Sequence, residues 1–325
     1  MTGQYTMFPV YEMSLNVRVT WQAHSLSTSG SNGSNKLMPR RQLLADGTET
    51  DACSGAIAKH HHSALLAQYL QAAGVPLCPA CRRRDSRRAG ALVDLEAYKQ
   101  MTIDQILTQC GLCDAHGFLV TAKNAGSGGQ EARQGIRKDT LIDYSFALAL
   151  PGRHAETVQL TTRMGDSKDE GQMLMKMTAR SGEYALVVRY LSVGVGMDVQ
   201  KWHLAVTDPQ QRLQRHQAIL LTLRDTLLSP DGALTAAMLP HLTGLEGALV
   251  IRTGVGRAPT YSALKDDFIT RLQAMESETC RVTAFETVDG FHSLMEELIQ
   301  TSYPSLPPTS SYTAPRTSIS EGEKK

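Results

Sequence analysis

The sequence lacks an excess of charge of either sign. Its 325 residues include 33 lysines and arginines against 32 aspartates and glutamates, so the formal net charge is +1. This balance excludes a chain that is basic throughout, as polybasic nucleic-acid binders are. Any surface that binds an anion must therefore be local.

Long apolar runs and common catalytic motifs are also missing. No stretch approaches the roughly 20 residues that cross a bilayer, and the start MTGQYTMFPVYEM has no basic region followed by an apolar one. We therefore expect a soluble cytoplasmic protein that makes no membrane contact. The chain has no HExxH motif, no Walker loop and no nucleophile elbow, which favours binding over catalysis.

Four of the six cysteines form two CxxC pairs, Cys78 with Cys81 and Cys110 with Cys113. Each pair places two thiols on one side of a tight turn, and four thiolates suit a tetrahedral zinc ion. We predict a structural zinc site, because four sulfur ligands leave no position open for a reactant. Four free thiols are the alternative, and a redox dithiol would need no second CxxC pair. Between the pairs lies RRRDSRR at 82–88, which either contacts a nucleic-acid backbone or forms a solvated basic face.

Apolar and polar side chains alternate strictly over residues 13–24, MSLNVRVTWQAH. This pattern predicts a strand with one buried face. The other face carries Arg18 and is either a ligand-binding face or an ordinary solvated one.

The following segment, 25–53, is rich in Ser, Gly and Asn. This composition predicts a long irregular loop. Loops of this length inside a domain are usually functional or disordered, and this one carries Lys36, Arg40 and Arg41. We therefore favour a functional loop.

A helix is predicted to begin at Ser54, where SGAIAKHHH follows the loop. Its first turn offers free N–H groups and the positive end of the helix dipole. Gly55 leaves room for a close approach, and Lys59 stands one turn in with His60 or His62. This arrangement predicts an anion cradle, with a plain N-capped helix and surface histidines as the alternative. The three consecutive histidines do not form one metal site, because they point about 100° apart around the helix.

The order of the remaining elements indicates the fold. With the cysteine-rich segment and a hairpin set aside, it is strand, helix, strand, strand, helix, strand, which is typical of a ferredoxin-like or RRM-like sheet. We predict an α+β fold with an RRM-like palm, an inserted Cys-rich zinc subdomain and a projecting β-hairpin. The predicted boundaries are 10–74 for the first half of the palm, 75–118 for the insert, 119–156 for a palm strand region, 157–182 for the hairpin, 183–300 for the second half of the palm with further helices, and 301–325 for a disordered Pro-, Ser- and Thr-rich tail.

The segment from LNVRVTW to HHHSALL, residues 15–66, resembles the opening of the DevR-type backbone subunits of CRISPR class 1 surveillance (Cascade) complexes, in the RAMP superfamily. Those subunits share the first strand, an Asn- and Gly-bearing loop, a basic step, an acid-rich turn and a Ser-Gly helix start that ends in Lys-His. The resemblance continues through GEYALVVRYLSVGV at 182–195. This chain departs from the family pattern at two points. Relatives often carry Asn where this chain has Ala56, and the double CxxC insert is not general in the family.

This resemblance implies a non-catalytic subunit that binds CRISPR guide RNA, oligomerises along it in a type I Cascade complex, and supports pairing between the guide and a target DNA strand. It implies the guide, the target strand, copies of this chain and other Cascade subunits as partners. The hairpin would be a thumb that pushes between bases, with methionines as wedges, although methionines at this spacing are as often core. The RNA-binding residues expected on this basis are Arg18, Asn32, Asn35, Lys36, Arg40, Arg41, Ser54, Gly55, Lys59, His60, His62, Met164, Met173, Met175 and Lys176.

Two other functions stay open. The first is a metal-dependent target-RNA nuclease subunit of a type III-like effector, with its acid taken from ADGTETD: Asp46, Glu49 or Asp51. These acids are equally good turn formers. The second is a transcriptional regulator, against which the lack of a helix-turn-helix signal counts.

Overall fold

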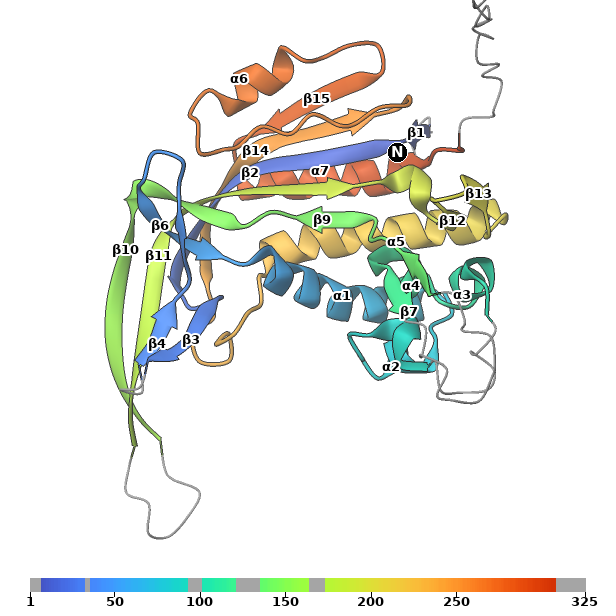
Figure 1. Ribbon diagram of the computed structural model, residues 1–325. Coiled ribbons are helices and arrows are strands. Elements are labelled where there is room, and N and C mark those ends of the chain that lie inside the picture. The colour runs from blue at the N-terminus through green and yellow to red at the C-terminus, as the bar shows by residue number, and fades with distance from the viewer. Residues whose placement is uncertain (1–6, 33–35, 93–100, 121–134, 164–172, 308–325) are drawn as a thin grey trace, which may run out of the picture.

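One long antiparallel sheet forms the centre of the fold (Figure 1). The computed structural model describes residues 7–32, 36–92, 101–120, 135–163 and 173–307. The middle strand is β2 (Glu12–His24), which pairs with β11 (Met173–Tyr190) on one side and with β14 (His241–Arg252) on the other. Outward from β14 lies β15 (Cys280–Phe285). On the other side, β11 pairs with β9 (Ile142–Tyr144) and β10 (Ala147–Arg163), and β10 is followed by β6 (Glu49–Cys53) and β5 (Arg41–Leu43).

The alternation of apolar and polar side chains in β2 buries one face of the strand, as predicted. Leu15, Val17 and Val19 share one buried core with side chains of α1 (Gly55–Ala72), α5 (Pro209–Leu228) and α7 (Val288–Thr301). Figure 1 shows α1 and α5 side by side below the sheet. The molecule is thus a mixed α/β fold in which helices cover one face of the sheet. Within the described part of the chain, every helix is too short or too polar to cross a membrane.

The other face of the sheet is covered as well. Residues 258–272, which include most of α6 (Phe268–Gln273), form a second core with the opposite side chains of β14. Arg18 lies under this cover and is only 9% exposed. Its guanidinium donates to the carbonyl oxygen of Ala263 at 2.8 and 3.2 Å and pairs with Glu246 and Asp266. The prediction that this polar face is open is therefore wrong, and Arg18 is not exposed to a ligand.

The cysteine-rich insert packs against α1. It extends past its predicted end at residue 118, because β7 (Phe118–Val120) pairs with β8 (Ile136–Lys138). Its other elements are α2 (Pro79–Arg82), the 3-10 helix η1 (Arg88–Leu92), α3 (Ile103–Gln109) and α4 (Gly111–His116). Leu107 and Leu112 of the insert belong to the same core as Leu66 and Leu70 of α1. After β11 come the 3-10 helix η3 (Ser192–Gly194) and a short hairpin of β12 (Met197–Asp198) and β13 (His203–Leu204).

Two segments contain strands where none was expected. The predicted irregular loop, 25–53, holds β3 (Thr28–Asn32), β4 (Lys36–Pro39), β5 and β6, which pair at the sheet edge. The predicted tail, 301–325, begins too early, because β16 (Ser302–Pro304) pairs in parallel with β1 (Phe8–Val10). Both predictions rested on polar composition, which does not exclude strands whose backbone groups find partners elsewhere in the chain. Residues 308–325 lie outside the described part.

Candidate metal centre and nucleic-acid interface

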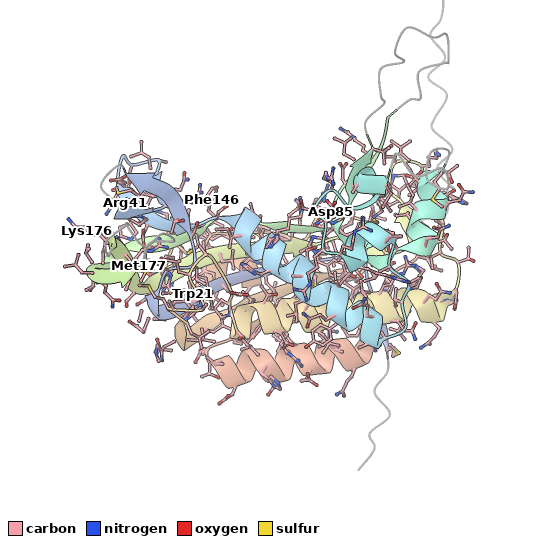
Figure 2. The ribbon with its side chains drawn as sticks, turned by 90° about the horizontal axis from the view of Figure 1, so that it is seen from below. Trp21, Arg41, Asp85, Phe146, Lys176 and Met177 are labelled. Carbon is pink, nitrogen blue, oxygen red and sulfur yellow. The ribbon has the colours of Figure 1, made fainter. Side chains whose placement is uncertain are left out.

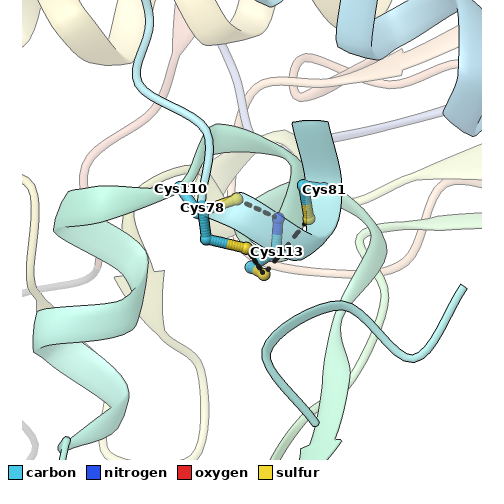
Figure 3. Close-up of side chains that lie close together, drawn as sticks. All are labelled: Cys78, Cys81, Cys110 and Cys113. Atoms are coloured by element: carbon cyan, nitrogen blue, oxygen red, sulfur yellow. Dashed lines mark hydrogen bonds between the residues drawn. The ribbon is translucent and has the colours of Figure 1, made fainter. Parts of the chain in front are cut away.

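Four cysteines converge between two short helices of the insert (Figure 3). Cys78 is the residue before α2 and Cys81 lies within it, while Cys110 precedes α4 and Cys113 lies within it. The Sγ atom of Cys110 accepts a hydrogen bond from the backbone N–H of Cys113 at 3.3 Å. All four sulfur atoms lie within 4.8 Å of one another, so the fold joins the two CxxC pairs.

The spacing of these sulfur atoms fits a tetrahedral zinc ion. Zn–S bonds of about 2.3 Å require sulfur atoms about 3.8 Å apart. The Sγ of Cys113 is 3.6 Å from that of Cys81 and 3.9 Å from that of Cys78. All four side chains are buried, and all six cysteines of the chain are free of disulfides.

The pKa of one of these thiols also favours a bound cation. Contact with Cys110, then with the other two sulfur atoms, and burial raise the pKa of the Cys113 thiol. Neighbouring thiolates repel one another, so a cation between the four sulfur atoms would favour their ionised form. Four buried sulfur ligands would close the coordination sphere, so the centre is suited to a structural ion and not to catalysis.

A wide cleft of about 1310 Å³ separates the insert from the sheet. The charged residues of its lining are predominantly basic, with seven lysines and arginines against two aspartates: Lys59, Arg87, Arg88, Arg137, Lys138, Arg189 and Arg257 against Asp139 and Asp143. These residues come from α1, the turn before η1, η1 itself, β8 and the residue after it, β9, the end of β11 and the connection after β14. The positive field of this nearly neutral chain is thus concentrated locally.

Several of the cations in the cleft already have acidic partners. Arg189 pairs with Asp143 at 2.5 Å, Arg257 with Glu12 at 3.0 Å, and buried Lys138 with Asp114 at 3.2 Å. Arg87 is paired in the same way with Asp85 at 2.8 Å. The remaining three cations are Lys59, Arg88 and Arg137, and none of them makes an ion pair within the described ranges.

Lys59 and Arg88 lie close enough to affect each other. Burial, followed by the charge of Arg88, lowers the pKa of Lys59. The Nε atom of Arg88 is buried without a hydrogen-bond partner among the described residues. Two neighbouring cations and an unused donor make this corner of the cleft complementary to a phosphate.

The start of α1 differs from the predicted anion cradle. Ser54 caps the helix, and its side chain accepts from the N–H of Ala56 at 3.2 Å. A Cβ atom on Gly55 would lie 2.5 Å from the carbonyl oxygens of both Tyr144 and Ser145. Gly55 is therefore required for backbone packing, and the space beside it is not open to a phosphate.

The histidines separate as the helix geometry requires. His60 is exposed and its ring lies against that of His61. His62 is buried, with its Nδ1 atom 2.8 Å from Nε2 of His116, and burial lowers its pKa to about 3. His62 is therefore a neutral core residue and not an RNA contact. Sequence reasoning missed His116, because nothing local in CDAHG indicates its partner.

Arg40 and Arg41 of the segment 25–53 do not lie in one site with Lys59. Arg40 donates to Ser27 Oγ at 3.2 Å and to the carbonyl oxygen of Thr28 at 3.1 Å. Arg41 pairs with Glu156 of β10 at 3.0 Å and with Glu49. In Figure 2, Arg41 lies at the left of the molecule and Asp85 right of its centre, with Phe146 between them. Arg40 and Arg41 do not line the cleft that contains Lys59.

The predicted hairpin is present as the outer parts of β10 and β11, which project beyond the rest of the sheet (Figure 1). Lys176 is exposed on it. Asn32, Lys36, Met173 and Met175 lie in strands β3, β4 and β11, where Lys36 is in register with Lys176. Asn35 and Met164 lie outside the described residues.

Two exposed apolar side chains of the hairpin were not predicted. Val158 and Leu160 of β10 are 46% and 66% exposed. The signal was present in the alternation of TVQLTT, which places both side chains on one face of the strand.

The acids of the nuclease hypothesis have structural contacts. Asp46 accepts from the N–H of Thr48 at 2.9 Å, and Glu49 pairs with Arg41. Asp51 is buried against Arg180 at 3.0 Å. In the part of the chain that the structure describes, the four cysteines are the one group of three or more candidate ligands. The nuclease function is not favoured.

Comparison with known proteins identifies the family. Chains of two solved structures are similar to this one: a "CRISPR RNA-guided surveillance complex, pre-nicking" (12% identity, 83% of this chain and 89% of the other, TM-score 0.48) and a "CRISPR RNA-guided surveillance complex" (10%, 88% and 98%, TM-score 0.47). No curated protein matches the sequence. The family described as "CRISPR-associated negative auto-regulator DevR/Csa2" matches residues 15–271, which confirms the resemblance found in the sequence. The chain therefore belongs to the DevR/Csa2 family of CRISPR-associated proteins.

Proposed function

We propose that this chain is a non-catalytic backbone subunit of a type I Cascade complex, which binds CRISPR guide RNA, oligomerises along it and supports pairing of the guide with target DNA. Membership of the DevR/Csa2 family supports the CRISPR context. The single observation that carries the binding role is the basic cleft, in which Lys59, Arg88 and Arg137 have no acidic partner among the described residues.

The chemistry of the cleft suits a nucleic-acid backbone. Arginine and lysine bind phosphate through charge and N–H donors and do not read the sequence of bases. Sequence recognition is then left to base pairing by the guide itself. The three cations of the cleft that lack an ion pair with a described residue predict a slope of about −2 for log K against log salt on a single strand, at about −0.7 per cation.

The strand arrangement supports the role of the sheet as a palm. The order β14, β2, β11 and then β9 with β10 follows the 4-1-3-2 order of a ferredoxin-like sheet, with α1 and α5 as its two crossing helices. The outer part of the β10–β11 hairpin is the thumb of this proposal, and exposed Leu160 and Val158 are apolar side chains that it presents to bases. The zinc centre holds the insert that forms one wall of the cleft.

Alanine variants of the three unpaired cations test the proposal. Lys59→Ala, Arg88→Ala and Arg137→Ala should each weaken binding of single-stranded RNA equally for unrelated sequences. The salt slope should also decrease by about 0.7 per variant. Arg82→Ala is the matched control, because this exposed arginine belongs to the same insert but does not line the cleft.

Binding and assembly are measured by gel shift at several salt concentrations and by light scattering of the purified complex. A loss confined to some RNA sequences, or a monomer that ignores RNA at low salt, would refute the proposal. Duplex DNA in the same assay separates it from the regulator hypothesis, since a regulator should prefer the duplex.

A further inference from the structure

Trp202 lies at the border of the basic cleft and is 48% exposed. The other tryptophan of the chain, Trp21, is 4% exposed in the core. Trp202 also has a φ angle of +52°. Bulky side chains rarely adopt this left-handed backbone conformation. Where the surrounding structure enforces such a conformation, the residue is typical of a functional site.

The turn that carries Trp202 is closed by the pairing of Asp198 with His203 and is anchored by contacts of residues 197–201. The buried side-chain carboxylate of Asp198 accepts a hydrogen bond from the N–H of Gln200 at 3.0 Å. The backbone carbonyl oxygen of Asp198 accepts a hydrogen bond from the N–H of Lys201 at 3.2 Å. Met197, at the base of the hairpin, is buried against Tyr11. These contacts hold Trp202 at the surface, although apolar burial alone would favour folding it inward.

The side chains around Trp202 indicate the chemistry of its ligand. The side-chain amide of Gln200 donates to the backbone carbonyl of Arg137 at 3.4 Å, which ties this turn to β8. The guanidinium of Arg137 is exposed and makes no ion pair with any described residue. An aromatic side chain and a free cation that line the same cleft are together complementary to a nucleobase with its phosphate. An apolar protein partner would not require the excess of cations that lines the cleft.

We infer that Trp202 is a stacking platform for an unpaired base of single-stranded RNA, and that Arg137 contacts the phosphate next to that base. The inference rests on the proposed function and adds to it a residue that contacts bases, whereas Lys59 and Arg88 contact only the strand backbone. Because every base has a flat π face, the platform accepts any base and leaves the cleft insensitive to sequence.

The test uses the full chain with two probes, a single-stranded oligoadenylate and a strand of equal length that carries abasic nucleotides. Trp202→Ala should weaken binding of oligoadenylate by about 5- to 150-fold and leave binding of the abasic strand unchanged. Trp202→Phe should restore most of the affinity. Tyr303→Ala is the control, because Tyr303 is an exposed aromatic residue that does not line the cleft.

Intrinsic fluorescence gives an independent measurement, because only two tryptophans are present. Oligoadenylate should quench the emission of the wild type and leave that of Trp202→Phe, which reports only buried Trp21, unchanged. Equal affinity of wild type and Trp202→Ala for oligoadenylate would overturn the inference alone. The same conclusion follows if Trp202→Ala alters only the size of the assembly, because Trp202 would then be a protein contact. A wild type that binds neither strand would remove the proposed function together with this inference.

Discussion

Replacement of Asp114 with Asn should cause a large loss of stability. Its carboxylate lies 3.2 Å from Nζ of Lys138, 3.0 Å from Nη1 of Arg215 and 2.8 Å from the N–H of Gly196. The three charged side chains are each no more than 2% exposed. Without the carboxylate, two buried cations lose their shared partner, and breaking a buried pair costs about 3–5 kcal/mol.

The two cations respond differently to this loss. Burial already lowers the pKa of Lys138, against the opposing effect of Asp114. Lys138 can therefore release its proton in the variant, whereas an arginine side chain in general keeps its charge in proteins. We expect a decrease of about 3–5 kcal/mol in the free energy of unfolding, and part of it should return in Asp114→Asn with Lys138→Met.

Urea unfolding followed by circular dichroism measures the effect. Asp85→Asn is the control, because Asp85 makes a comparable contact with Arg87 at the surface, and its midpoint should not change. A loss below about 1 kcal/mol for Asp114→Asn, which is the size of a surface ion pair, would refute the reasoning. It would show that Lys138 and Arg215 are neutralised or solvated in some other way.

Three further predictions concern the metal centre, a close backbone approach and acid stability. Cys78→Ser and Cys110→Ser should each remove bound zinc and lower the Tm; a metal-free wild type whose Tm equals that of both variants would contradict the zinc centre. Gly55→Ala should destabilise the fold by about 1–3 kcal/mol, because its Cβ would lie 2.5 Å from two carbonyl oxygens, and an unchanged urea midpoint would argue against this contact. Stability should decrease as the pH falls from 6.5 toward about 3. The reason is that the unfolded chain protonates His62 near pH 6.5, whereas the buried ring of the folded chain has a pKa of about 3. Equal urea midpoints at about pH 7 and about pH 5 would contradict this buried neutral histidine.

Elements that are specified locally could be predicted from the sequence. Asp208 and Pro209 mark the start of α5, and Ser54 marks the start of α1, because capping depends on residues within one turn. The alternation in β2 likewise indicated which side chains are buried. The two CxxC pairs together predicted one site of four cysteines, because a structural zinc ion needs four ligands.

Features that depend on distant segments could not be predicted. The polar face of β2 looked open because its cover, residues 258–272, lies more than two hundred residues further along the chain. The cleft takes its lining from α1, the insert, β11 and the turn that carries Trp202, and no local pattern indicates that these segments meet. His62 was expected beside an anion, but its partner His116 lies in the insert.

The pairing of β2 has a consequence for synthesis of the chain. Val19 pairs with Tyr184 on one side and with Leu245 on the other, so β2 leaves the ribosome long before either neighbour exists. Its apolar row of Leu15, Val17 and Val19 stays unburied during that interval, and contacts so distant in sequence form slowly. Nascent chains should therefore depend on chaperones until β14 has been translated, and truncation before His241 should yield aggregates instead of a partial sheet.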